Sequence, residues 1–349
     1  MIGITYPGHS SEDVTIAYGA SGVTSVTKAG AGTTTYSRSD SGNTRTVTVT
    51  PASVTPAMSA TVYTFDIAKQ RMTSVTRTEN SVNRTTTFTY DSAGRLTRTT
   101  MPEGNYVQLT LDGRGNVTET RAVGKSGSGV SDIVTTAGFD TTCSVPKTCN
   151  QPNWTRDAKN NQTDYAYDST HGGVLTVTRP ADTSGTRPQT RYVYSTLQAY
   201  YYSGSSIVAS GQATYRLTSI SSCRTLASCS GSSDERKNVM DYGPQTTGVG
   251  NNLHLLSVTT RLGDGTLAAT STIAYDAVGN AATVDGPQSG TADQSMFNYN
   301  GARQPLWQIG PDPDGAGAPR ANVNRDSCLG QIKLQGSTAH EHIDELFHA

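Results

Sequence analysis

Five cysteines carry the most distinctive chemistry in this sequence. Four of them form two local pairs, Cys143 with Cys149 and Cys223 with Cys229, and Cys328 stands alone. Five residues separate the members of each pair, which is wider than the spacing typical of structural zinc sites, and neither pair has a histidine nearby. We therefore expect two disulfides that close small loops, with free thiols as the alternative. Disulfides persist in oxidising compartments, so these pairs would indicate export.

Three of the six histidines lie close to the C-terminus, in a pattern that resembles a metal site. His340 and His342 flank Glu341, and His348 follows. The zinc-protease pattern H-E-x-x-H is not met, because Asp344 occupies the place of its second histidine. We interpret these histidines as chance members of a tail, and we expect no metal site.

Other catalytic and cofactor-binding patterns are also missing from the sequence. The segment Gly124–Gly129 contains Gly-Lys-Ser, but a phosphate-binding loop would also need a glycine at position 119, which is glutamate. There is no G-x-S-x-G motif, and no carboxylate pair stands apart from the aspartates of turns. The sequence therefore predicts a protein that is not an enzyme and has no cofactor.

Composition points to a repetitive sheet rather than a compact globule. Among 349 residues, 34% are hydrophobic, and 17 Tyr stand against 5 Phe and 2 Trp. A repeat array can fold with so few apolar residues, because each unit packs mainly on its neighbours. The net charge of −1 gives no electrostatic case for nucleic acid or an anionic membrane. The sequence has no apolar run long enough to cross a bilayer and no visible signal peptide.

The stretch Thr86–Gly104 shows the element that repeats along the chain. Phe88 and Tyr90 are two residues apart, so they share one face of an extended strand. The segment 91–94 then supplies a turn that starts with Asp and ends with Gly, the residue that adopts positive φ most easily. A return strand follows, and residues 101–104 turn the chain again. This pattern predicts a β-hairpin with a turn at each end.

The same pairing of apolar residues before a turn recurs along most of the chain. It is found at Tyr63/Phe65, Phe88/Tyr90, Leu109/Leu111, Ala137/Phe139, Tyr165/Tyr167, Tyr192/Tyr194, Ile273/Tyr275 and Phe297/Tyr299. The spacing fixes strand register, because a slip of one residue would move each pair to the opposite face. Asn160 stands where glycine is usual in the turn at 157–160, and Asn is the best non-glycine residue for a left-handed position.

These residues resemble the RHS or YD repeat family. The motif is carried by Tyr90, Asp91, Gly94, Arg95, Leu96, Pro102 and Gly104, spaced as the family spaces them. Further positions of the motif are Asp112, Gly115, Tyr167, Asp168, Tyr275, Asp276, Gly279 and Tyr299. The resemblance is strongest over residues 61–180 and 270–315.

The hairpins and the resemblance together predict an all-β fold. We expect a repetitive array of antiparallel hairpins that curls into an open spiral sheet, like an RHS or YD shell. Residues 1–60 are expected to be degenerate RHS-like strands, and 61–320 to be the repeat region of the same array. Residues 321–349 are expected to be a non-repeat tail, either a short helix or an out-of-frame extension.

The resemblance also implies a function. RHS repeats form hollow shells, as in the cocoons of insecticidal Tc toxins and the YD shell of teneurins. We therefore expect a structural, encapsulating shell segment of a secreted polymorphic-toxin-type protein. Its partners would be the remainder of a longer RHS polypeptide or its toxin cargo. The alternative is a cell-surface adhesion or carbohydrate-binding module that contacts a glycan. We further expect the chain to be a fragment of a longer protein, located outside the cell or on its surface.

Overall fold

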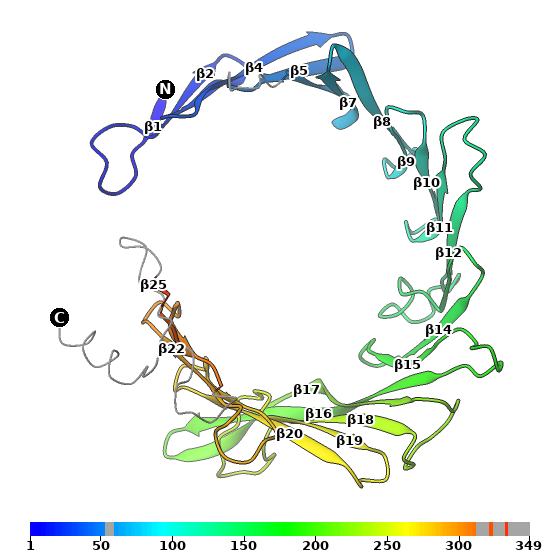
Figure 1. Cartoon of the computed structure of the whole chain (residues 1–349), viewed down its shortest axis with the longest axis vertical. Helices are drawn as coiled ribbons and strands as arrows, with labels where there is room; N and C mark the ends of the chain where they lie inside the picture. The colour runs from blue at the N-terminus through cyan, green and yellow to red at the C-terminus, as the bar shows by residue number, and fades with distance from the viewer. Residues whose placement is uncertain (53–58, 312–320, 324–331, 334–349) are drawn as a thin grey trace. The chain divides into compact units, whose positions relative to one another are not determined.

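The computed structural model describes residues 1–52, 59–311, 321–323 and 332–333. Within these residues every regular element is a β-strand, and there are 25 strands (Figure 1). The strands pair in antiparallel fashion with the strands that precede and follow them in the chain, which confirms the predicted all-β hairpin array. The predicted terminal helix, the tail histidines and Cys328 lie outside the described residues.

The chain divides into two compact units, residues 1–162 and 163–349. The strands that lie in the first unit are β1 Ile2–Ile4, β2 Val14–Gly19, β3 Gly22–Lys28, β4 Gly32–Ser41, β5 Thr44–Thr50, β6 Thr61–Asp66, β7 Arg71–Glu79, β8 Val82–Tyr90, β9 Leu96–Thr100, β10 Tyr106–Leu111, β11 Val117–Val123, β12 Ile133–Gly138 and β13 Trp154–Arg156. Each strand from β1 to β12 pairs with the next one along the chain.

The second unit repeats this up-and-down order with longer strands at its centre. It contains β14 Gln162–Tyr167, β15 Val174–Thr178, β16 Gln189–Ser203, β17 Ser206–Cys223, β18 Glu235–Asp241, β19 Ser257–Leu262, β20 Ala268–Tyr275, β21 Ala281–Asp285, β22 Ser295–Tyr299, β23 Pro305–Ile309, β24 Ala321–Val323 and β25 Ile332–Lys333. Consecutive strands again pair with each other.

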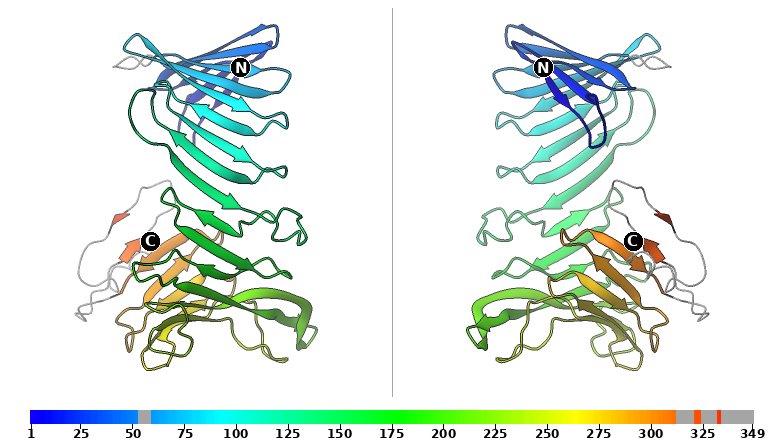
Figure 2. Two further views of the ribbon diagram at one scale, coloured as in Figure 1. Left: turned by 90° about the vertical axis from the view of Figure 1, so that its right-hand side faces the viewer. Right: turned by 90° about the vertical axis from the view of Figure 1, so that its left-hand side faces the viewer.

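The up-and-down order places the turns of the first unit on two opposite edges of its sheet. In Figure 2 the strands of this unit, coloured blue to green, lie side by side between these edges. The "first edge" carries the turns at 42–43, 66–70, 91–95 and 112–116 and the loop 139–153. The "second edge" carries the turns at 29–31, 80–81, 101–105 and 124–132. The two Asp-Gly turns at 91–95 and 112–116 therefore lie on the same edge of the sheet.

The two faces of this sheet differ in chemistry. One row of cross-strand neighbours contains Arg38, Val47, Tyr63 and Val75, and we call its side the "arginine face". A row on the other side, the "hydroxyl face", consists of Ser39, Thr46, Thr64, Ser74, Thr87 and Thr100. Alternating side chains with β-branched and aromatic members favour strands, which explains why this sequence forms them.

The described residues form almost no buried core. No described side chain is less than 2% exposed, and the buried hydrophobic residues are few: Cys149, Tyr200, Cys223, Cys229, Leu253, Ile309 and Ala321. Such sheets depend on contacts between neighbouring strands rather than on a second layer. Within the described residues no helix is long and apolar enough to cross a membrane.

One predicted turn is wrong. The pair Tyr192/Tyr194 was expected to precede a turn, but β16 continues to Ser203 and pairs with β17 up to Ser203↔Ser206. The turn instead falls at Gly204, which has a φ of 65°. The reason is local, since Ser195 and Thr196 supply neither the Asp nor the Gly that the other turns contain.

Candidate functional site: the repeat turns

The turn after Tyr90 has a compact set of hydrogen bonds. The Asp91 N–H donates to the Arg95 carbonyl at 2.9 Å, and the Gly94 N–H donates to the Asp91 carbonyl at 3.0 Å. The Asp91 carboxylate accepts the Arg95 N–H at 2.8 Å and the Arg95 Nε–H at 2.7 Å. Gly94 has a φ of 85°, which a residue without Cβ adopts at little cost. Asp91 thus holds the first and last residues of the turn together.

The same arrangement recurs in both units. The first residue of the turn is Asp112, Asp157, Asp276 or Asn300, and the residue four positions later is Asn116, Asn161, Asn280 or Gln304. In the three aspartate turns the later residue donates its backbone N–H and a side-chain N–H to the aspartate carboxylate. In the fourth turn the Gln304 N–H donates to the Asn300 side-chain oxygen, and the Asn300 side-chain amide donates to the Gln304 side-chain oxygen. The residue before it has a positive φ, and Gly115, Asn160, Gly279 or Arg303 occupies that place.

These hydrogen bonds also affect the charge state of the aspartates. The backbone N–H of Arg95 and then its guanidinium lower the pKa of Asp91 below its ordinary value. The side-chain amide of Asn161 and then its backbone N–H lower the pKa of Asp157. The turns that begin with Asp91 and Asp157 are therefore each held by an ionised carboxylate at neutral pH.

Two predicted motif positions occur in variants of this turn. At Asp168 the turn is one residue longer, because its N–H donates to the Gly173 carbonyl and the Gly172 N–H donates to the Asp168 carbonyl. In the turn that contains Pro102, the Gly104 N–H donates to the Met101 carbonyl at 2.9 Å. Pro102 and Gly104 belong to the second edge, whereas Asp91 and Asp112 belong to the first.

A β-bulge lies at the aromatic or apolar residue that comes just before the turn in several hairpins. At Tyr90 the register shifts, so that Thr89 pairs with Arg98 and Tyr90 pairs with Leu96, and Thr97 is the extra residue. The Thr97 hydroxyl donates to the Thr89 carbonyl at 3.1 Å. The same bond is made at three other bulges by the extra residues Thr73, Thr118 and Thr218. A threonine therefore satisfies the carbonyl that the bulge leaves without its usual partner.

The turn tyrosine contacts the preceding strand in a recurring way. Tyr90 donates its hydroxyl proton to the Met72 carbonyl at 2.7 Å, and the guanidinium of Arg71 lies 5.6 Å from its ring centroid. Tyr275 donates to the Leu255 carbonyl at 2.9 Å, and the ring of His254 lies 4.4 Å from its ring.

A third tyrosine repeats this contact outside the full motif. Tyr242 donates to the Leu217 carbonyl at 3.1 Å, beside Arg216 at 6.0 Å. In all three cases the ring partner immediately precedes the residue whose carbonyl accepts the hydrogen bond. We call this arrangement the "tyrosine clasp"; it joins Arg71–Met72 to Tyr90, Arg216–Leu217 to Tyr242 and His254–Leu255 to Tyr275.

The tyrosine clasp also lies against the glycine of the turn that follows the tyrosine. A Cβ on Gly94 would lie 1.5 Å from the Arg71 guanidinium, and a Cβ on Gly279 would lie 2.8 Å from the His254 ring. Glycine is therefore needed for its positive φ, and the absence of a Cβ also leaves room for the ring or guanidinium that packs against the turn.

Consecutive turns on the first edge are also bonded to each other. Arg95 Nη1 donates to the Asp112 carbonyl at 3.0 Å, so the second turn accepts a bond from the first. Arg114 reaches the next loop and donates to carbonyls of Asp140, Thr141 and Cys149. These bonds link the turns at 91–95 and 112–116 to the loop 139–153, so each repeat in this part of the first edge fixes the position of the next.

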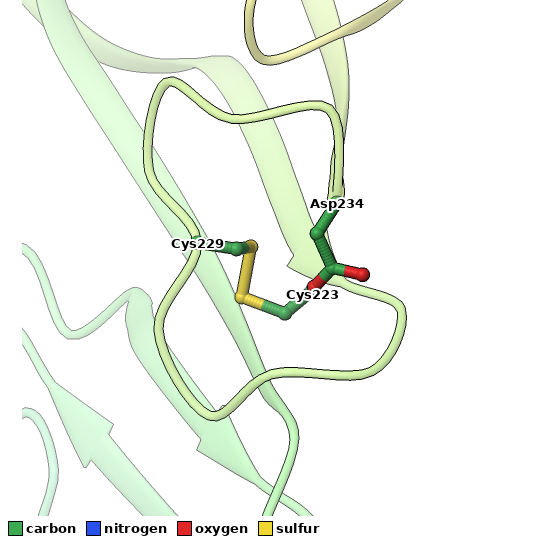
Figure 3. Close-up of side chains that lie close together, drawn as sticks. All are labelled: Cys223, Cys229 and Asp234. Atoms are coloured by element: carbon green, nitrogen blue, oxygen red, sulfur yellow. A yellow bond between two sulfur atoms is a disulfide. The ribbon is translucent and has the colours of Figure 1, made fainter.

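The paired cysteines close two loops. Disulfides join Cys143 to Cys149 and Cys223 to Cys229 in the structure. The first lies in the loop that accepts the bonds of Arg114. The second lies between β17 and β18 with the Asp234 carboxylate beside it (Figure 3).

Asp234 and the second cysteine pair also have the spacing of a metal site. One ligand atom from each of Cys223, Cys229 and Asp234 lies within 4.8 Å of the others. The carboxylate of Asp234 accepts hydrogen bonds from Thr225 and Leu226. Because the two sulfurs are bonded to each other and the carboxylate is occupied, this group holds a loop in place rather than presenting thiolate ligands.

Several residues of the repeat were not identified from sequence. Arg71, Arg216 and His254 lie about 20 residues before the tyrosines they contact, and no short motif connects them. Tyr167 and Tyr299 were predicted as motif residues; Tyr167 stacks on Tyr165 with ring centroids 6.4 Å apart. The recurring Asn116 and Asn280 did provide a signal, since each stands four residues after a turn aspartate.

Comparison with known proteins identifies the repeated unit. The RHS Repeat family matches residues 68–106 and 90–126, which cover β7 to β11 and the turns just described. The chain contains RHS repeats over residues 68–126. No curated protein sequence matches the chain.

Solved structures show where a related fold occurs. The chain is similar to a crystal structure of TcdB2-TccC3-Cdc42, with a TM-score of 0.51 and 14% identity, over 91% of this chain and 16% of that chain. A crystal structure of TcdB2-TccC3-TEV gives a TM-score of 0.34 and 11% identity, over 93% of this chain and 21% of that one. A structure of a Photorhabdus luminescens Tc holotoxin pore with mutated TccC3 gives a TM-score of 0.31 and 10% identity, over 94% of this chain and 21% of that chain.

The first of these solved structures supports the fold of the chain. Only the first TM-score is high enough to support an argument, and at 14% identity it concerns the fold alone. The RHS-repeat chain spans about a sixth of the length of that neighbour. The fold of the chain is therefore similar to that of part of a larger protein.

Proposed function

We propose that this RHS-repeat chain is a structural segment of a shell wall and performs no catalysis of its own. The observation that carries the proposal is the line of contacts along the first edge, where Arg95 bonds to the turn at Asp112 and Arg114 bonds to the following loop. Such contacts fix each repeat to the next. They suit a wall that must keep its curvature without a packed second layer.

The proposal extends to what the wall encloses. Its partners would be the remainder of a longer RHS polypeptide and a toxin cargo, in a protein that is secreted or held at the cell surface. The two disulfides support an oxidising location, because such bonds are rare in reducing compartments. Peptide mass spectrometry of non-reduced protein expressed under oxidising conditions is expected to show both linkages. Free thiols at all four positions would remove this support for export.

Protease protection tests the enclosing role. The experiment uses the natural polypeptide with its flanking sequence, and follows cleavage of the segment that comes after the repeats. We expect that segment to resist protease in the native protein. Gly115→Val should expose it, because Gly115 has a φ of 98° and its Cβ would lie 3.2 Å from Arg95 Nη1.

Gly113 provides a matched control in the same turn. Its φ is not positive, and a Cβ placed on it has no atom within 4 Å. Gly113→Val is therefore expected to leave protection unchanged. Rapid cleavage of the following segment in the native protein would show that these repeats do not enclose it.

The second hypothesis from sequence, a cell-surface adhesion or carbohydrate-binding module, remains a separate proposal. A glycan array probed with the purified chain tests it directly. Binding to cell-surface glycans without any protected cargo would favour this function over the wall.

A further inference from the structure

The loop between β17 and β18 brings three potential metal ligands together. The sulfurs of Cys223 and Cys229 and a carboxylate oxygen of Asp234 all lie within 4.8 Å of one another (Figure 3). These residues are buried, with exposed fractions of 7%, 5% and 9%. While the disulfide is intact, the two sulfurs are bonded to each other. Reduction of that bond converts the group into two thiolates and one carboxylate, which are all ligands that Zn²⁺ accepts.

Hydrogen bonds hold the three ligands in place independently of the disulfide. Cys223 ends β17 and pairs with Glu235, the first residue of β18 and the neighbour of Asp234. The Cys229 carbonyl accepts the Ser232 N–H at 3.0 Å and the Ser232 hydroxyl at 2.7 Å. Because these bonds do not involve sulfur, we expect the ligands to stay within reach of one another after reduction.

The Asp234 carboxylate is oriented by its own hydrogen bonds. It accepts the Thr225 N–H at 3.1 Å, the Thr225 hydroxyl at 2.7 Å and the Leu226 N–H at 3.0 Å. A carboxylate has about four lone-pair positions, so three donors leave one for a metal ion. Hydrogen bonds of this kind commonly fix the orientation of carboxylates that ligate metals.

The neighbouring charges suit a dication with three anionic ligands. Zn²⁺ with two thiolates and one carboxylate has a net negative charge, and Arg224 Nε lies 3.9 Å from Asp234 Oδ1 to offset it. The Glu235 carboxylate is engaged elsewhere, because it accepts Arg191 Nη2 at 3.0 Å and the Gly231 N–H at 2.7 Å. The ligand set is therefore two cysteines and one aspartate, with the fourth tetrahedral position left for water.

We propose that reduction of the Cys223–Cys229 disulfide creates a Zn²⁺ site formed by the two thiolates and the Asp234 carboxylate. Two molecules of a small thiol supply the two electrons and two protons, and leave as their own disulfide. Zn²⁺ then displaces the two cysteine protons to solvent, and the sulfurs move apart to about 3.8 Å, as two Zn–S bonds of about 2.3 Å require. The loop is thus closed by a disulfide under oxidising conditions and by a metal ion under reducing conditions. The proposal concerns one loop and does not depend on the enclosing function.

The other cysteine pair provides an internal control. Cys143 and Cys149 have the same separation in sequence as Cys223 and Cys229. Among the described residues, no histidine or carboxylate completes a group of three ligands with Cys143 and Cys149. A comparison of the two reduced pairs therefore measures what the third ligand contributes.

Zinc titration before and after reduction tests the proposal. The chain carries Cys328→Ser, so that only the two pairs supply thiolates, and a phosphine reduces the disulfides with water as the oxygen source and is then removed. Zn²⁺ binding is measured by competition with a chromophoric chelator. We expect reduction to add one tight Zn²⁺ site. The Cys143→Ser, Cys149→Ser double variant should keep this site, and the Cys223→Ser, Cys229→Ser double variant should lose it.

A second pair of variants tests the carboxylate. Asp234→Asn is expected to weaken Zn²⁺ binding by the reduced chain about tenfold or more, because it removes a charged ligand. Asp140→Asn is the matched control, since Asp140 accepts bonds from Thr142 and Ser144 beside the other disulfide but belongs to no group of three ligands. Circular dichroism is used to establish that each variant keeps its strand content.

X-ray absorption at the zinc edge tests the ligand set without a substitution in the site. The reduced, zinc-loaded Cys143→Ser, Cys149→Ser chain should show two sulfur neighbours at about 2.3 Å and oxygen neighbours at about 2.0–2.2 Å.

Four results would overturn the assignment. They are a Cys223–Cys229 disulfide that the phosphine does not reduce in the folded chain, no additional Zn²⁺ site after reduction, equal Zn²⁺ binding by the two double variants, and equal weakening by Asp234→Asn and Asp140→Asn. A zinc-edge spectrum without sulfur neighbours would also contradict it.

Discussion

At the scale of single residues, the tyrosine of the repeat does more than fill space. Its ring lies against Arg71 or His254, and its hydroxyl bonds to the carbonyl of Met72 in the preceding strand or to that of Leu255 in the loop before β19. Phenylalanine could replace the ring but not the hydrogen bond. This explains why the motif contains Tyr at the position where an apolar residue alone would set strand register.

Tyr90→Phe tests the clasp. We expect the free energy of unfolding to fall by about 1 kcal/mol, because a half-buried hydrogen bond is lost and the Met72 carbonyl loses its donor. Denaturant titration followed by circular dichroism measures the change. Tyr202→Phe is the control, since Tyr202 is 73% exposed, and it should have almost no effect. Equal effects of the two substitutions would argue against the clasp.

The turn aspartates make stability depend on pH. The pKa values of Asp91, Asp157 and Asp276 are lowered in the folded chain, and that of Asp140 falls to about 2. A lowered folded-state pKa stabilises the fold above the unfolded value of about 3.9, and this contribution is lost as pH falls through the folded value.

We therefore expect the denaturation midpoint to be constant from neutral pH to about pH 5 and to fall below about pH 4. Thermal scans between those limits and pH 2 measure it. Asp91→Asn should lower the midpoint at pH 7 and make its decline at acid pH shallower. A native midpoint that does not change down to pH 2 would show that the turn carboxylates do not contribute.

At the scale of elements, each hairpin combines a turn, a bulge and a return strand. The extra residue of the bulge is Thr73, Thr97, Thr118 or Thr218 in four hairpins, and its hydroxyl bonds to the opposing carbonyl. Other bulges have a different extra residue, such as Ala282 opposite Ala274–Tyr275. The bulge is thus common to the repeats, whereas the threonine bond strengthens only some of them.

Thr97→Val tests the contribution of this bond. The two side chains have similar shape, so the substitution removes the hydroxyl that donates to Thr89, and we expect a loss of about 1 kcal/mol in unfolding free energy. Thr86→Val is the control, because among the described residues the Thr86 hydroxyl has no hydrogen bond in the structure. A destabilisation by Thr86→Val as large as that by Thr97→Val would contradict the assignment.

At the scale of the whole molecule, stability comes from contacts between strands that are neighbours in the sheet. Strands pair with the next strand along the chain, and no described side chain is fully buried in a shared core. In such arrays each repeat contributes its own stability and its interfaces with adjacent repeats. Local damage is therefore expected to stay local.

Hydrogen–deuterium exchange tests this expectation. Gly94→Val places a side chain where φ is 85° and where the Arg71 guanidinium lies. We expect faster exchange in β7 to β11 and unchanged exchange in β19 to β22. Faster exchange throughout both units would show instead that the molecule unfolds as one cooperative domain.

The sequence by itself determined the hairpins and their turns. An Asp-x-x-Gly segment closes through bonds between residues at most four apart, as between Asp91 and Arg95, so its meaning is readable locally. The alternation of Phe88 and Tyr90 fixed which side chains share a face for the same reason. The antiparallel order then followed, because short turns leave no room for a parallel crossover.

Only the tertiary structure decided which distant residues meet. Arg71 and Tyr90, or His254 and Tyr275, are brought together by the pairing of whole strands. The residue types alone do not predict which of these side chains will be in contact. The same holds for the length of β16, which continues past Tyr194 because β17 pairs with it as far as Ser203↔Ser206. Short-range hydrogen bonds can be predicted from residues that are close in the sequence, whereas contacts across strands depend on register, twist and strand length together.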